Sequence, residues 1–403
     1  MARLSTARRH RLWQRTRIRS RAFAYDAATA SRPLSMVDRF ANFARVAGVL
    51  VAMTLAGCAS TREADRIPEA PRLLPFTYGR ASFGSFNGGV RAILEDRDGS
   101  FWFGSHLEGV CRVDGGRIRH FTRADGLGDD QIRSIQEAPD GSIWFDTGSG
   151  VSSFEVGRIM RRADGGLRSI APWTLDPGDL WFKADEANGF PEPGVLRLRE
   201  GRLDFLAFPA TPLRRDGALH DVTGFARGAG GRLWIATYEA VFGFDGSSVA
   251  VIDGERMGLR GGEGVPHVRC VFEDSRGRVW IGNNGVGVVV VDGDATYGLA
   301  PLAGEGDALL RMGAPLAASV AADSDESLQR VFSIGEDRDG DIWFGTIDGG
   351  AWRYDGRVLR QFTAEDGLTT PHVMSIYRDR DGVLWLGGNG VFRFDGRRFE
   401  RVH

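Results

Sequence analysis

A tryptophan motif that occurs seven times is the feature that most constrains the fold of this 403-residue chain. Three copies agree closely: VRAILEDRDGSFWFGS from Val90, VFSIGEDRDGDIWFGT from Val331 and VMSIYRDRDGVLWLGG from Val373. Three others have diverged, and the weakest copy is DPGDLWFKAD around Trp181. Self-similarity at a period of tens of residues indicates a repeat architecture. The recurring tryptophans are Trp102, Trp144, Trp181, Trp234, Trp280, Trp343 and Trp385.

Each copy belongs to a unit that reads as four short strands. The first strand alternates in polarity, as it does from Val373, and its third residue is always small. A D-x-D-G turn follows, as at Asp339-Gly340, and Asp-Gly is a strong hairpin signal. The second strand carries the tryptophan and ends at a glycine such as Gly345. A further turn, as at Asp355-Gly356, joins the third strand to the fourth.

Four short strands every 40 to 50 residues predict an all-β fold, a seven-bladed β-propeller of four-stranded antiparallel blades over residues 73–403. A tryptophan at one position in each blade is expected to pack between blades. Two ways of closing the ring stay open. Either the last blade keeps its own outer strand, Arg398 to Val402, or the Pro75 to Thr77 segment contributes to it. Cys111 and Cys270 fall in blades 1 and 4 of this register, too far apart for a disulfide.

The segment before the repeats carries a targeting pattern. Residues 36–57 have a short basic region, an apolar run and the closing sequence Leu-Ala-Gly before Cys58. This segment resembles a bacterial lipoprotein signal peptide, because its apolar run is shorter than the roughly 20 residues that span a bilayer. The resemblance implies that Cys58 carries a lipid and that residues 58–72 are a flexible tether. Residues 1–35 are expected to be a disordered or misassigned Arg-rich leader, with Met36 as the alternative start.

The charge distribution argues against nucleic-acid binding. Residues 1–57 hold eleven Arg against two Asp, a charge of +9, so the net charge of −2 leaves −11 for the remainder. A domain that acidic lacks the basic surface that phosphate backbones require. We therefore expect no nucleic-acid partner, a membrane contact through the lipid anchor alone, and a monomer.

The order of motifs resembles a known repeat family. Phe121-Thr122, Asp125-Gly126-Leu127, an I-x-x-I strand and D-G-x-I-W-F follow one another, and the same order returns from Phe362 to Leu386. This order resembles the two-component-regulator propeller repeat, which forms the ligand-sensing periplasmic propellers of hybrid histidine kinases. The chain stops at His403 after its last blade, so we expect a free-standing sensor propeller without its own kinase. More distantly, the repeat is similar to the streptogramin-lyase propellers.

Polar residues stand where the loops of a propeller would meet the mouth of the central channel. Functional residues concentrate on such loops, while the strands serve as scaffold. Some of these residues directly precede the first strands, and others directly follow the tryptophan strands. The predicted ligand-binding set is Asn87, His106, Gln131, Lys183, His220, Tyr238, His267, Asn284, Arg330, Asp348, His372 and Asn389.

Catalytic and metal signals are weak by comparison. No His pair has close ligand spacing, and neither a P-loop nor a nucleophile elbow is present. We therefore predict no catalytic residue, no metal and no cofactor. The main hypothesis is an outer-membrane lipoprotein facing the periplasm that binds a small molecule, an oligosaccharide, a peptide or a partner protein. Two alternatives remain open: a Mg²⁺-dependent lyase or hydrolase using residues such as His267, His372 and Glu239, and an assembly platform at the outer membrane.

Overall fold

The computed structural model describes residues 89–163, 173–184, 190, 194–208, 221–259, 266–299, 309–311 and 328–402, all within the unit Pro68–His403. The predicted leader, signal peptide, lipidated Cys58 and tether lie outside the described residues, as do Asn87 and His220. Within the described part of the chain, no helix is long and apolar enough to cross a bilayer.

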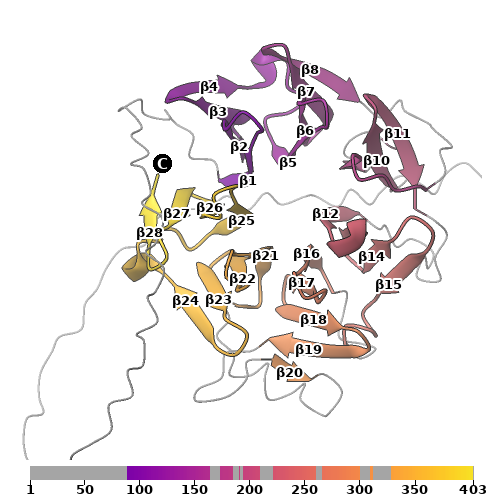
Figure 1. The fold of residues 1–403 in the computed structure, drawn as a ribbon, viewed down its shortest axis with the longest axis vertical. Coiled ribbons are helices and arrows are strands. Elements are labelled where there is room, and N and C mark those ends of the chain that lie inside the picture. The colour runs from indigo at the N-terminus through magenta and orange to yellow at the C-terminus, as the bar shows by residue number, and fades with distance from the viewer. Residues whose placement is uncertain are drawn as a thin grey trace, which may run out of the picture. The chain divides into compact units, whose positions relative to one another are not determined.

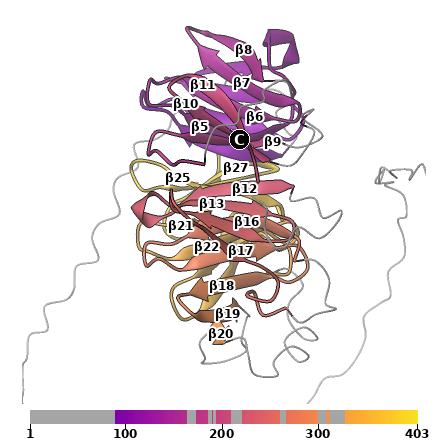
Figure 2. The same cartoon turned by 90° about the vertical axis from the view of Figure 1, so that its right-hand side faces the viewer.

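The described strands form seven antiparallel sheets that stand around a common centre as the blades of a propeller (Figures 1 and 2). The predicted seven-bladed all-β fold is therefore confirmed. Blade 1 contains β1 (Val90–Glu95), β2 (Phe101–Ser105), β3 (Val110–Asp114) and β4 (Arg117–Phe121). Blade 2 contains β5 (Ile132–Glu137), β6 (Ile143–Thr147), β7 (Gly150–Glu155) and β8 (Arg158–Ala163). Blade 3 contains β9 (Leu180–Ala184), β10 (Gly194–Arg199) and β11 (Arg202–Ala207).

The remaining sheets continue in chain order. Blade 4 contains β12 (Val222–Arg227), β13 (Leu233–Thr237), β14 (Val241–Phe244) and β15 (Val249–Ile252). Blade 5 contains β16 (Val268–Glu273), β17 (Val279–Asn283), β18 (Val288–Asp292), β19 (Ala295–Leu299) and β20 (Leu309–Arg311). Blade 6 contains β21 (Val331–Glu336), β22 (Ile342–Thr346), β23 (Ala351–Tyr354) and β24 (Leu359–Phe362). Blade 7 contains β25 (Val373–Arg378), β26 (Leu384–Gly388), β27 (Gly390–Phe394) and β28 (Phe399–Arg401).

Two blades depart from the predicted four strands. In the described residues blade 3 has three strands in the order β11-β10-β9, and blade 5 has a fifth strand, β20, outside β19. The described residues directly before β9, residues 173–179, contain Pro177 and Gly178 and form no strand. Cys270 lies in β16 of blade 5, so its predicted place in blade 4 is wrong; both Cys111 and Cys270 are free thiols.

The recurring tryptophans pack between neighbouring blades, as the repeat predicts. All seven are at most 4% exposed, and each belongs to a different hydrophobic cluster. The cluster of Trp385, for example, joins blade 7 to Val90, Phe101 and Cys111 of blade 1. In four blades the first Asp of the turn accepts a hydrogen bond from the indole, as Asp337 does from Trp343 at 2.7 Å.

A second contact recurs between blades at the end of each inner strand, by which we mean β1, β5, β12, β16, β21 and β25. Where the sixth residue is Glu, its carboxylate accepts from the turn of the preceding blade, as Glu137 does from the Arg97 amide at 3.0 Å. Where it is Arg, the guanidinium donates to carbonyls of that turn, as Arg227 does to Asp179 at 2.8 Å. Six of the seven blade interfaces carry this clasp in the described structure; the exception is the interface between blades 2 and 3, where the described residues of blade 3 include no inner strand.

The ring closes by direct packing of blade 7 on blade 1. Blade 7 takes all four strands from the C-terminal end of the described chain, as one of the two predicted arrangements requires. Across the closure the Glu95 amide donates to the Tyr377 hydroxyl at 3.0 Å, and the Arg380 amide donates to the Glu95 carboxylate at 3.0 Å. The Pro75 to Thr77 segment lies outside the described residues.

The glycine two residues after the tryptophan is required by close blade packing. A Cβ on Gly387 would lie 2.8 Å from Val90 Cγ1 and 2.9 Å from the Val90 carbonyl oxygen of the next blade. Gly387→Ala is therefore expected to lower the free energy of unfolding by about 1–3 kcal/mol, measured by urea denaturation. Gly254→Ala is the control, because the nearest atom to its Cβ would be 3.8 Å away. Equal stability of the two variants would contradict the assigned packing.

Candidate functional site

The strand order brings both predicted loop sets to one end of the ring. Each inner strand pairs antiparallel with the tryptophan strand of its blade. The residue before the inner strand therefore lies beside the residue after the tryptophan strand. His106, for example, donates its amide to the Gly89 carbonyl at 2.9 Å, and Asn284 donates to the His267 carbonyl at 3.0 Å. We call this end, at which the inner strands begin, the mouth; the turns after the inner strands lie at the opposite end.

Blades 1 and 2 bring two predicted site residues together at the mouth. The Arg91 guanidinium donates to His106 Nδ1 at 2.9 Å, and the Gln131 amide lies 3.3 Å from the same nitrogen. Arg91 is the second residue of β1 and was not part of the predicted set. Because a guanidinium only donates, Nδ1 of His106 must be the acceptor and the ring is neutral with its proton on Nε2.

This geometry predicts the titration of His106. Burial and the nearby positive charge of Arg91 lower its pKa from the usual 6.5. The unfolded chain therefore binds more protons than the folded chain, and the contribution of His106 to stability is lost as the pH falls below about 6.5 through the folded-state pKa. NMR titration of the His106 ring is expected to give a pKa below 6.5 that rises in Arg91→Gln. An unchanged pKa in that variant would mean that Arg91 does not face the ring.

Blades 4 and 5 form a second group at the mouth. The rings of Tyr238 and His267 have centroids 5.8 Å apart. The Arg269 guanidinium donates to the Tyr238 hydroxyl at 3.2 Å and lies 5.0 Å from the Tyr238 ring and 5.1 Å from the Phe332 ring. Tyr238 belongs to blade 4 and Phe332 to blade 6, so a side chain that touches both must lie in the channel in front of its own blade 5. His267 has a φ of +50°, a left-handed conformation that is uncommon outside glycine.

Lys183 lies on β9, whose one edge pairs with β10 and whose other edge pairs with no described strand. Side chains of blade 2 contact this second edge: Gln136 donates to the Trp181 carbonyl at 2.8 Å, and Asp146 accepts from the Lys183 amide at 3.0 Å. Asp146 is 1% exposed and stands where four other blades have glycine and blade 4 has Ala236. These side chains satisfy backbone groups of β9 and connect blade 2 to blade 3.

Other described members of the predicted set have contacts of their own. Arg330 and Asp348 form an exposed ion pair at 3.4 Å, and the backbone of Arg330 bridges to Asn284. His372 is held by its amide, which donates to Thr370 Oγ1 at 3.1 Å. Asn389 is exposed and its carbonyl accepts from Arg401 at 3.5 Å. The structure therefore brings together the side chains of His106 and Gln131, of Tyr238 and His267, and of Arg330 and Asp348, and it joins Asn284 to His267 and Arg330 through the backbone.

Sequence reasoning missed the arginines of the channel wall. Arg91, Arg133 and Arg269 each occupy the second position of an inner strand, one residue inside the loops that were searched. The signal was present, because strand alternation places the second residue opposite to the buried first and third residues. The same position holds Thr223, Phe332 and Met374 in the other inner strands.

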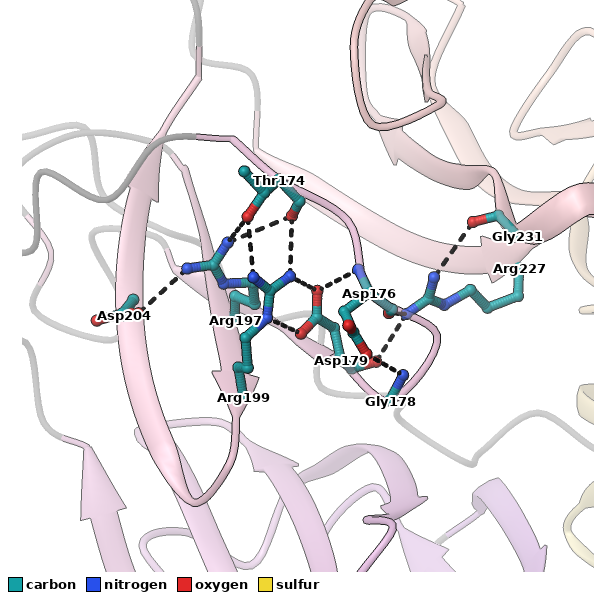
Figure 3. Close-up of polar contacts among 9 residues, drawn as sticks. All are labelled: Thr174, Asp176, Gly178, Asp179, Arg197, Arg199, Asp204, Arg227 and Gly231. Carbon is teal, nitrogen blue, oxygen red and sulfur yellow. Dashed lines mark hydrogen bonds and ion pairs between the residues drawn. The ribbon is translucent and has the colours of Figure 1, made fainter.

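The richest polar cluster of blade 3 lies at the opposite end of the ring and is structural (Figure 3). Asp179 receives two hydrogen bonds from Arg199, at 2.7 and 2.6 Å, and Arg197 pairs with Asp204 at 3.2 Å. Arg227 of blade 4 donates into the same turn. Each of these arginines faces a carboxylate or a backbone carbonyl, so the cluster fixes blade 3 to blade 4 in place of a regular turn.

The metal and platform alternatives gain no support from the described residues. Among the residues that the structure describes, no three His, Cys, Asp or Glu side chains are grouped to hold a metal ion. Large exposed apolar side chains in the described part of the chain are scattered over four blades: Leu107, Val156, Val286 and Val358.

A known family of repeats matches the inner and tryptophan strands of several blades. Residues 84–106, 262–285, 325–348 and 367–390 match the model described as two component regulator propeller. The chain contains two-component-regulator propeller repeats. The matched repeats cover the inner and tryptophan strands of blades 1, 5, 6 and 7. Among curated proteins, none matches the chain significantly.

Solved structures with similar folds were also found. The extracellular domain of the hybrid two-component system BT4673 from B. thetaiotaomicron is similar at 19% identity and a TM-score of 0.52, over 76% of this chain and 38% of that one. The chain thus spans well under half of that protein, and the similarity shows the fold. Virginiamycin B lyase from Staphylococcus aureus is similar at 14% identity over 79% of this chain and 85% of that one, with a TM-score of 0.39, too low to bear on function.

Proposed function

We propose that this protein is a sensor-type propeller that binds a ligand at the mouth and is held at the cell envelope by a lipid on Cys58. The observation that carries the binding proposal is the convergence of ligand-capable side chains at one end of the ring. His106, Gln131 and Arg91 meet there from blades 1 and 2, and Tyr238, His267 and Arg269 meet from blades 4 and 5. Concave sites of this kind, with a few convergent polar groups, are the usual place for small ligands.

Two features support the mouth over the opposite end. The opposite end is occupied by tight turns whose polar groups are used by the fold, as in the clasps and the blade 3 cluster. At the mouth, Thr223 Oγ1 and Arg269 Nε are buried and have no hydrogen-bond partner, as is also the case for a few atoms within the blades, such as Arg112 Nε and Arg393 Nε. Buried polar atoms without partners are rare in folded proteins, and a ligand is one explanation for them.

The binding proposal is tested by a thermal-shift screen of the purified protein against oligosaccharides and short peptides. A ligand of the mouth is expected to raise the melting temperature of the wild type, and to do so much less in Tyr238→Ala and His267→Ala. Arg357→Gln is the matched control, because Arg357 is exposed on a turn at the opposite end. Equal shifts in all four proteins would place the site elsewhere.

The anchor is tested separately in cells. Because a lipidated cysteine requires its thiol, Cys58→Ser is expected to abolish incorporation of labelled palmitate and to release the protein from the membrane fraction. Labelling that persists in Cys58→Ser would exclude the proposed lipidation, while leaving the binding proposal untouched.

A further inference from the structure

The strongest unexplained feature of the mouth is its arginine content. Arg91, Arg133 and Arg269 come from blades 1, 2 and 5 and share one register position. The fold does not need arginine there, since the same position holds Thr223 in β12 and Met374 in β25. A ligand that binds guanidinium groups would account for arginine at this strand position in three blades, because the blade structure does not require it.

The partners of two of these arginines are neutral. Arg91 donates to the His106 imidazole and Arg269 to the Tyr238 hydroxyl, and within the described residues neither forms an ion pair. This pattern contrasts with the opposite end, where Arg199 and Arg197 each meet a carboxylate. A partly buried guanidinium without a carboxylate leaves donors and charge for a bound anion.

The electrostatics around Arg91 agree with this geometry. Its pKa is lowered, first by burial and then by the positive charges of Arg133 and Arg269, which outweigh the opposing effects of Asp146 and Tyr238. Arg133 and Arg269 belong to blades 2 and 5, and their strands β5 and β16 stand at the centre of the ring together with β1, which carries Arg91 (Figure 1). Guanidinium groups remain charged despite such shifts in pKa.

Four acidic groups at this end make contacts that hold the scaffold of the mouth. Asp146 accepts from the Lys183 amide, Asp348 pairs with Arg330, and Asp129 accepts from the Gln131 amide at 2.8 Å. Asp130 accepts from the Arg123 amide, also at 2.8 Å. In each of these contacts the partner is a group other than the guanidinium of Arg91 or Arg269.

We propose that Arg91 and Arg269 form an oxyanion site that binds the carboxylate or sulfate group of an acidic ligand. Guanidinium groups match the oxygens of such anions in pairs. The surrounding Tyr238 and Phe332 rings and the Gln131 amide would contact the uncharged part of the same molecule. This inference rests on the proposed ligand-binding function and names the chemical class that the mouth selects.

The test compares charged and neutral probes on the purified protein. Sodium sulfate and sodium glucuronate are titrated against sodium chloride of equal ionic strength, and D-glucose is the neutral partner of glucuronate. Binding is followed by calorimetry and by melting temperature. We expect saturable binding of at least one oxyanion and none of glucose, with Kd at least tenfold weaker in Arg91→Gln and in Arg269→Gln. Arg357→Gln, at the opposite end, is expected to bind as the wild type does.

The outcomes separate this inference from the proposed function. Sulfate also stabilises proteins by exclusion from their surfaces, but that effect does not saturate and would be equal in all variants. If neither oxyanion binds saturably, or if both arginine variants bind as tightly as the wild type, the oxyanion site is refuted. If at the same time a neutral oligosaccharide binds and Tyr238→Ala abolishes its binding, the mouth remains a ligand site. Should a Gln variant fail to fold, the glucuronate and glucose comparison on the wild type still decides.

Discussion

Replacing Trp343 by alanine is expected to lower the free energy of unfolding by about 3–5 kcal/mol, the range for buried aromatic residues in protein cores. Trp343 is fully buried between blades 6 and 7, with the rings of Phe362 and Phe394 each 4.9 Å from its own. The substitution would open a cavity there and leave the Asp337 carboxylate without its indole donor. Urea denaturation, monitored by far-ultraviolet circular dichroism instead of tryptophan fluorescence, measures the loss of stability.

Trp343→Phe is the matched variant for this prediction. A phenyl ring keeps most of the apolar contact and loses the hydrogen bond to Asp337, so we expect a smaller cost of about 1–2 kcal/mol. If the free energy of unfolding of the alanine variant falls by less than about 1 kcal/mol, the tryptophan does not hold neighbouring blades together, because removal of a buried indole costs more than that.

Restoring the regular repeat in blade 2 is expected to destabilise the protein. Asp146→Gly and Gln136→Leu introduce the residues found at these positions in blade 1, Gly104 and Leu94. Together they should lower the free energy of unfolding by about 2–4 kcal/mol, because the three hydrogen bonds between these side chains and the edge of β9 are lost. Equilibrium denaturation of the double variant measures the effect.

The direction of this effect is what makes the test informative. Consensus substitutions commonly stabilise proteins by about 0.5–2 kcal/mol. If blade 2 were only a diverged copy of the repeat, the double variant would therefore raise the free energy of unfolding. Asp146→Asn serves as the control, since an amide oxygen still accepts from the Lys183 amide; its cost is expected to be the smallest of the series. Stabilisation by the double variant would contradict the proposed role of these side chains.

The sequence predicted the ring well because its determinants are local and periodic. Tryptophan, Asp-Gly turns and the small third residue all repeat with the blade, and each is explained by a contact inside one blade or with its neighbour. The clasps between blades follow the same periodicity, as Glu95, Glu137, Glu273 and Glu336 at one position show, but their partners could not be read without the geometry.

The departures from regularity could not be predicted in the same way. The described part of blade 3 has three strands, and the hydrogen bonds from Gln136 and Asp146 to the edge of β9 come from another blade. At the mouth, loops were searched because loops usually carry function, whereas Arg91 and Arg269 lie on strands. Comparison of each inner-strand position across the blades would have found them, because the second position holds arginine in some blades and threonine, phenylalanine or methionine in others.

The most direct test of the proposed mouth is a crystal structure of the protein soaked in sodium selenate, with anomalous data at the selenium edge. We predict a selenium peak in the channel, within hydrogen-bond distance of the guanidinium group of Arg91 or Arg269, and no equivalent peak at the opposite end. Selenate bound only elsewhere, or arginines that point away from a common channel, would contradict the account.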